Sequence, residues 1–78
     1  MQNAKILIIE DAETLRRELT AFLKNYGYEV EAPDDFQNVM NYARQADVHL
    51  ILLDINLPVF DGYYICREIR KYSQVPIV

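Results

Sequence analysis

The chain has 78 residues, of which 51% are hydrophobic and 26% charged, which is enough for one small globular domain. The formal net charge is −4 and the eight Lys and Arg residues are scattered, so no nucleic-acid-binding surface is expected on this chain. No apolar run approaches the roughly 18 residues of a membrane span, and the start of the chain lacks the apolar core of a secretory signal. The single Cys66 excludes an internal disulfide and fits a reducing cytoplasm.

The first half of the chain alternates between strand and helix patterns. Lys5–Ile9 is short, apolar and branched, as expected of a parallel strand that is buried on both faces. Residues 13–26 predict a helix, and Gly27 follows as its terminator. Residues 28–32 alternate weakly and predict a shorter, more exposed strand near the sheet edge. A second helix follows Pro33, and its apolar stripe consists of Phe36, Val39, Met40, Ala43 and Ala46.

The helix predicted over residues 13–26 is amphipathic. Its charged side, with Arg16 and Arg17, is expected to face water, and its apolar side is expected to pack on the sheet. The apolar stripe consists of Leu15, Leu19, Phe22, Leu23 and Tyr26.

The second half continues the alternation. Residues 49–53 are the most apolar run and predict a third strand covered on both faces. Residues 63–72 predict a third helix, and its inward residues are Ile65, Cys66, Ile69 and Tyr72. Residues 76–78 look like the opening of a fourth strand. The order predicts one α/β domain over residues 1–78: a flavodoxin-like parallel sheet with helices on both faces, truncated at about the start of the fourth strand.

Three acidic residues follow the two most apolar strands. Glu10 and Asp11 come after the first strand, and Asp54 comes after the third. In the flavodoxin-like strand order 2-1-3-4-5 these strands are neighbours, and their carboxyl ends meet where the strand order reverses. The carboxylates then repel one another unless a cation lies between them. Oxygen ligands with no Cys or His nearby favour Mg²⁺, which takes one or two carboxylates and a phosphate.

Such a site leaves one carboxylate free to act as a nucleophile, as Asp does in proteins that form aspartyl-phosphates. Asp54 is the best candidate because it stands alone on its strand end, while Glu10 and Asp11 form a pair for the metal. The backbone near Asn56 is placed to supply one more oxygen. Two structural alternatives stay open, since Asp11 can cap the following helix and Asp54 can start a turn.

Two segments resemble the response-regulator receiver domain of two-component signalling. The first is ILIIEDAETLRRELTAFLKNYGYEV, which is similar to the start of that domain. The second is LILLDINLPVFDGYYICREIR, in which Asp54, Pro58, Asp61 and Gly62 match the family's phosphoacceptor loop in identity and spacing. The resemblance covers essentially all 78 residues.

The resemblance implies a signalling module rather than an enzyme, in which Asp54 accepts a phosphoryl group from a sensor histidine kinase. It also implies that Asp11 binds Mg²⁺ directly, that Glu10 acts mainly through water, and that the carbonyl of Asn56 completes the protein's share of the shell. The second segment is most similar to receivers with a winged-helix DNA-binding output domain, and among those to envelope-stress and antimicrobial-peptide regulators of Gram-positive bacteria. DNA is therefore expected as a partner only through an output domain outside this chain.

In the family, the domain continues for another strand-helix-strand-helix stretch. That stretch carries a hydroxyl residue at the end of the fourth strand and a lysine at the end of the fifth. We therefore expect a fragment that keeps some Mg²⁺ affinity, phosphorylates poorly and switches nothing. The third strand and the stub of the fourth should expose apolar edges, which invite pairing with another chain. This predicts an edge-strand or swapped homodimer.

Two other functions compete with this interpretation. Nucleotidyl-transfer or strand-cleaving enzymes of the topoisomerase-primase type also bind Mg²⁺ through a Glu after the first strand and an Asp-x-Asp after the third. Here Asp54-x-Asn56 supplies only half of that second pair, and the loop with Pro58, Asp61 and Gly62 has no place in it. The other alternative is a degenerate receiver that serves only as an interaction module, against which the intact acid site argues.

Overall fold

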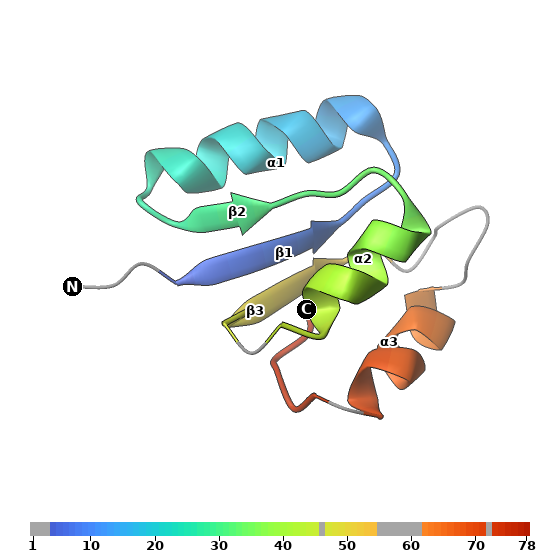
Figure 1. The fold of residues 1–78 in the computed structure, drawn as a ribbon. Helices are drawn as coiled ribbons and strands as arrows, with labels where there is room; N and C mark the ends of the chain where they lie inside the picture. Colours follow the sequence, from blue (N-terminus) through green and yellow to red (C-terminus); the bar gives the residue numbers. More distant parts are fainter. Residues whose placement is uncertain (1–3, 46, 55–61, 72) are drawn as a thin grey trace.

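The computed structural model describes residues 4–45, 47–54, 62–71 and 73–78. Strands and helices alternate along this part of the chain, as the sequence predicts (Figure 1). Three residues of the predicted phosphoacceptor loop, Asn56, Pro58 and Asp61, lie outside the described residues. The elements are β1 (Lys5–Ile9), α1 (Glu13–Asn25), β2 (Glu29–Glu31), α2 (Phe36–Ala43), β3 (Leu50–Leu53) and α3 (Gly62–Arg70).

The strands form a parallel sheet in the order β2-β1-β3. β1 is the central strand, and the short, more exposed β2 lies at the edge, as predicted. Residues 76–78 run along the other side of β3, where Ile51 and Ile77 form a parallel bridge. The order is therefore that of a flavodoxin-like sheet up to the start of a fourth strand, which confirms the predicted fold class.

The outer edge of β3 is not open in the way that the sequence predicts. The backbone N–H of Ile51 donates to the carbonyl of Pro76 at 2.9 Å, and the N–H of Leu53 donates to the carbonyl of Val78 at 2.9 Å. These bonds satisfy backbone groups that an edge strand would offer to another chain. The expected exposed edge is therefore wrong for β3, and the homodimer stays a prediction.

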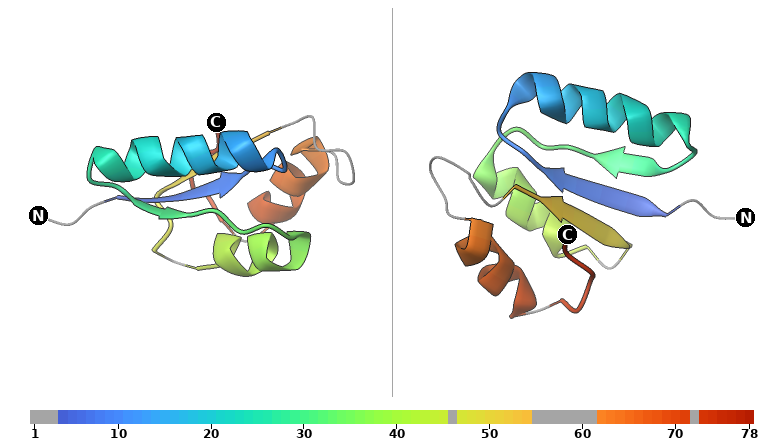
Figure 2. Two further views of the ribbon diagram at one scale, coloured as in Figure 1. Left: turned by 90° about the horizontal axis from the view of Figure 1, so that it is seen from above. Right: turned by 180° about the vertical axis from the view of Figure 1, so that it is seen from behind.

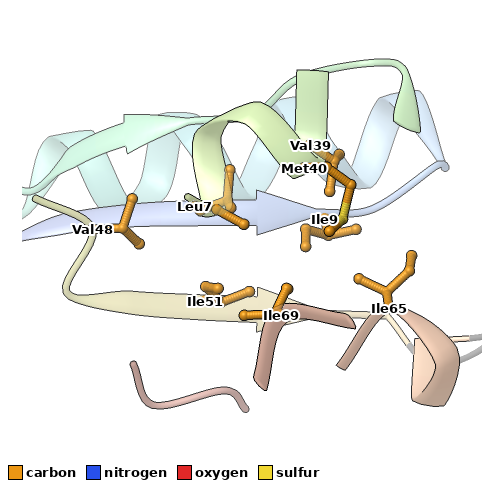
Figure 3. Packing of buried hydrophobic residues seen from close by; sticks show 9 residues of the cluster. Leu7, Ile9, Val39, Met40, Val48, Ile51, Ile65 and Ile69 are labelled. Atoms are coloured by element: carbon orange, nitrogen blue, oxygen red, sulfur yellow. The ribbon is translucent and has the colours of Figure 1, made fainter. Parts of the chain in front are cut away.

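One face of the sheet carries the hydrophobic core. α2 and α3 cover this face, and α1 lies on the opposite one (Figure 2). The close view in Figure 3 shows side chains of α2 and α3 directed at those of β1 and β3. The predicted inward residues Val39, Met40 and Ala43 of α2 are all buried. The cluster consists of Leu7, Ile9, Val39, Met40, Ala43, Val48, Ile51, Ile65 and Ile69.

The face under α1 is less well covered. β1 is buried on both faces, as predicted, but in β3 only Ile51 is buried, so the expectation of a fully covered third strand is wrong. The apolar stripe of α1 is also more open than expected, since Leu15 is 46% exposed and Phe22 58% exposed. α1 connects β1 to β2 and packs mainly on those two strands, which leaves this face of β3 less covered.

The ends of α1 show how its length is set. Gly27 has a φ of 93°, in the left-handed region that glycine adopts without strain, and its N–H donates to the carbonyl of Lys24 at 2.9 Å. Gly27 therefore terminates the helix, as predicted. Among the described residues no helix has the length and apolar character needed to cross a bilayer.

Candidate metal centre

The pairing of β1 with β3 places Glu10 and Asp54 side by side. Ile9 and Leu53 are register partners at the carboxyl ends of the two strands. The N–H of Asp54 then donates to the carbonyl of Ile9 at 3.0 Å, which extends the ladder by one bond. Because both strands run in the same direction, the residues that follow them emerge at one edge of the sheet.

Glu10, Asp11 and Asp54 bring one carboxylate oxygen each to within 4.8 Å of one another. Glu10 and Asp54 are half-buried and Asp11 is exposed. Oxygens bound to one octahedral Mg²⁺ lie about 2.9 Å apart when adjacent and about 4.2 Å apart when opposite. The three oxygens are thus farther apart than adjacent ligands of one ion, and binding would draw them inward or leave one of them to act through a water. The predicted convergence of the trio is found in the structure.

The loop that carries Glu10 and Asp11 is short and lacks the usual helix cap. Ala12 occupies the N-cap position of α1, and no side chain caps the helix there, so the alternative in which Asp11 caps it is wrong. Instead, the Oε2 atom of Glu10 accepts a hydrogen bond from the N–H of Ala12 at 3.1 Å. The Asp11 side chain is thus left at the mouth of the site and not at the end of the helix.

The electrostatics of the trio disfavour three negative charges. Burial raises the pKa of Glu10 the most, and the charge of Asp54, a side-chain hydrogen bond with Asp54 and the charge of Asp11 raise it further. The hydrogen bond from Ala12 opposes this pKa shift. Glu10 and Asp54 line one hollow together with apolar side chains, including Leu19 of α1. A cation at this point would relieve the repulsion.

Comparison with known protein families identifies the family of this chain. Residues 6–78 match the family described as the response regulator receiver domain. The chain belongs to this family. Receiver domains are in general signalling modules, so the alternative of a nucleotidyl-transfer or strand-cleaving enzyme finds no support.

Relatives of this receiver are found among curated proteins and solved structures. The transcriptional regulatory protein YxdJ of Bacillus subtilis is 45% identical over 74 residues, which cover 95% of this chain and 32% of YxdJ. The chemotaxis protein CheY4 of Vibrio cholerae is 30% identical with a TM-score of 0.88, over 97% of this chain and 66% of CheY4. This receiver spans about a third of the length of the curated relatives that it matches.

A third relative has been solved with a metal and with a partner. The response regulator TrrA of Thermotoga maritima, in complex with Mg²⁺ and BeF, is 27% identical with a TM-score of 0.82, over 95% of this receiver and 65% of TrrA. A second structure contains TrrA in complex with the histidine kinase ThkA, and there the TM-score is 0.83 with the same coverage.

Arg16 is a residue near the site that sequence reasoning missed. The helical pattern placed it on the wet side of α1 together with Arg17. In the structure the Nη1 atom of Arg16 donates to the main-chain carbonyl of Glu10 at 3.2 Å, and the contact is partly buried. The pattern of apolar residues along a helix does not reveal a contact to a main-chain atom six residues away. A long side chain with N–H donors in the first turn of a helix, directly after a short loop, could have predicted it.

At the amino ends of β1 and β3, opposite the acidic trio, Lys5 forms polar contacts with the segment that precedes β3. The Nζ atom of Lys5 lies 3.2 Å from Oδ2 of Asp47 and 3.3 Å from Oε1 of Gln45. The backbone N–H of Lys5 donates to Nδ1 of His49 at 2.9 Å, and the N–H of His49 donates to the carbonyl of Lys5 at 2.8 Å. His49 therefore helps to join the amino ends of β1 and β3.

Proposed function

We propose that this chain is the phosphoacceptor part of a two-component response regulator, with Asp54 as the phosphorylated residue. The observation that carries the proposal is the convergence of Glu10, Asp11 and Asp54 at the point where the strand order reverses. A binding site is expected at that place in an open parallel sheet. The donor is a phosphohistidine on a sensor histidine kinase.

Asp54 acts as the nucleophile in the proposed reaction. One carboxylate oxygen forms a bond to phosphorus while the bond between phosphorus and the histidine nitrogen breaks. The electron pair of that bond stays on the imidazole, and the product is an aspartyl-phosphate. The half-buried position of Asp54 limits access by competing water. The hydrogen bond from its backbone N–H to the carbonyl of Ile9 holds the main chain of Asp54 in place at the edge of the sheet.

Asp11 and Glu10 serve the same reaction by holding Mg²⁺, and the resemblance adds the carbonyl of Asn56. A bound Mg²⁺ neutralises negative charge on the transferring phosphoryl group. Asp11 binds the ion directly in this proposal, and its exposed side chain supports that role. Glu10 already accepts a hydrogen bond from Ala12, which suits it to act through a water molecule. Mg²⁺ commonly keeps several waters of this kind.

The relatives support the partners in this proposal. TrrA has been solved with Mg²⁺ and BeF and with a histidine kinase. YxdJ is named a transcriptional regulatory protein, which supports an output that controls transcription through DNA. The reaction takes place in the cytoplasm, where the half-buried thiol of Cys66 stays reduced.

The test compares Asp54→Asn with a matched control, Asp34→Asn. Both changes remove one negative charge, and Asp34 is an exposed acid after β2. With a radiolabelled small-molecule phosphodonor and Mg²⁺, we expect hydroxylamine-labile label in the wild type and in Asp34→Asn, and none in Asp54→Asn. Equal label in both variants would contradict the assignment of Asp54. Signalling that survives Asp54→Asn in cells would support a degenerate receiver that acts only through protein interactions.

A further inference from the structure

The loop between β1 and α1 must hold its shape with few anchors. It consists of residues 10–12, and it carries two of the three acids of the metal centre. Its last residue, Ala12, is the N-cap of α1 and has no side-chain oxygen with which to close the first turn. Other groups must therefore fix the position from which Glu10 and Asp11 reach the metal.

Two of the hydrogen bonds that hold this loop differ in origin, since one forms within the loop and the other comes from a side chain of α1. One uses the carboxylate of Glu10, which accepts the N–H of Ala12 at 3.1 Å. The other uses the main-chain carbonyl of Glu10, which accepts Nη1 of Arg16 at 3.2 Å. The first bond competes with any metal or metal-bound water for the same carboxylate. The second does not, because it leaves both carboxylates of the loop available.

We propose that Arg16 is a positioning residue for the metal centre, holding residues 10–12 in the shape that presents Glu10 and Asp11 to Mg²⁺. This inference rests on the proposed Mg²⁺ site. The guanidinium suits the task because it is a rigid planar group with several donors in fixed directions. Its place in the first turn of α1 ties the loop to a regular helix, and the helix in turn packs on the sheet.

Arg17 offers a matched control one residue away. Its side chain is 77% exposed, and its Nη2 atom pairs with Oε2 of Glu13 at 2.8 Å within the same helix. Replacing Arg17 therefore removes the same charge from the same turn without touching the loop. Arg16→Met and Arg17→Met both keep an unbranched apolar stem with good helix propensity. Arg16→Met removes the contact to Glu10, whereas Arg17→Met removes the exposed pair with Glu13.

The first measurement is the Mg²⁺ affinity of the 78-residue chain, read from the rise in melting temperature as MgCl₂ is titrated. We expect an affinity about tenfold weaker in Arg16→Met, since loss of a group that supports metal ligands typically weakens binding about 10–100-fold. Arg17→Met should stay within about twofold of the wild type. Arg16→Lys keeps the charge and a single donor nitrogen, so it should recover part of the lost affinity. It also replaces Arg16→Met in this test if that variant does not fold.

The second measurement needs no metal. In EDTA, hydrogen exchange of the backbone amide of Ala12 should be faster in Arg16→Met than in the wild type and unchanged in Arg17→Met. Equal Mg²⁺ affinity and equal exchange in the two Met variants would overturn the role of Arg16 while leaving the proposed function in place. A wild-type chain that binds no Mg²⁺ would instead overturn the proposed site, and this inference with it.

Discussion

The two ends of the β1–β3 pair carry charged groups arranged in opposite ways. At the amino end, the ammonium of Lys5 lies 3.2 Å from the carboxylate of Asp47. At the carboxyl end, Glu10 lies with Asp11 and Asp54, and one oxygen of each is within 4.8 Å of the others. The same two strands thus join unlike charges at one end and like charges at the other.

The pKa values of Lys5 and Glu10 are both raised, but the two shifts have opposite meanings. The hydrogen bond from Lys5 to Asp47 is the largest cause of its raised pKa, so the fold favours the charged form of Lys5. Burial and the neighbouring Asp54 raise the pKa of Glu10, so the fold disfavours the charged form of Glu10. The amino end is balanced by the protein itself, whereas the carboxyl end calls for a cation from outside.

The largest expected effect comes from supplying that cation. Mg²⁺ at a hundred times its dissociation constant should stabilise the fold by about 2.7 kcal/mol, because it binds only the native site. For a chain of this length, that corresponds to a rise in melting temperature of about 10–20 °C. Differential scanning fluorimetry with MgCl₂, against NaCl at equal ionic strength, measures it. Asp47→Asn should keep the full rise. An equal rise in melting temperature with NaCl would show that screening of the carboxylate repulsion by salt is enough and that no specific Mg²⁺ site is needed.

A smaller effect should follow from Glu10→Gln in the metal-free protein. The Gln oxygen can still accept the N–H of Ala12, while the charge is removed. Because the pKa of Glu10 is raised in the fold, its protonated form favours folding below pH 4.5, and that contribution is lost as the pH rises through the folded-state pKa. The variant should therefore be slightly more stable than the wild type at pH 7, with the difference vanishing near pH 4, and the gain is small because Glu10 is partly exposed.

Urea unfolding in EDTA at pH 4 and pH 7 measures this difference. With MgCl₂ present the order should reverse at pH 7, since the variant lacks one of the carboxylates that we propose to hold the ion. A variant less stable than the wild type at pH 7 without metal would mean that the carboxylate repulsion is already compensated.

The sequence was sufficient to predict the topology and the convergence of the acids. Buried parallel strands are apolar along their whole length, so Lys5–Ile9 and the run that ends at Leu53 stand out, and the acids at their ends follow from parallel geometry. The loop with Asn56 lies outside the described residues, so the predicted carbonyl ligand stays a prediction, as do the roles of Glu10, Asp11 and Asp54.

Features that depend on contacts across the chain were not predictable in the same way. The exposure of Leu15 and Phe22 follows from where α1 lies over the sheet, which apolar periodicity does not encode. Arg16 reads as a solvent-facing residue because periodicity records which side chains are apolar, and its main-chain acceptor on Glu10 has no sequence signature. The bond from Lys5 to His49 is of the same kind, because a ring nitrogen takes the place of a strand carbonyl.

The smallest effect is expected from Asp47→Asn at the amino end. Asp47 is 64% exposed on its side chain, and exposed ion pairs contribute little. The sign is nevertheless set: because the pKa of Lys5 is raised in the fold, the pair stabilises the protein below pH 10.5, and this contribution is lost as the pH rises through the folded-state pKa. Urea unfolding should show a slightly less stable variant at pH 8 and a smaller difference above pH 11. A gain in stability at pH 8 would mean that Asp47, like Glu10, is held against its own charge, and the contrast between the two ends would fail.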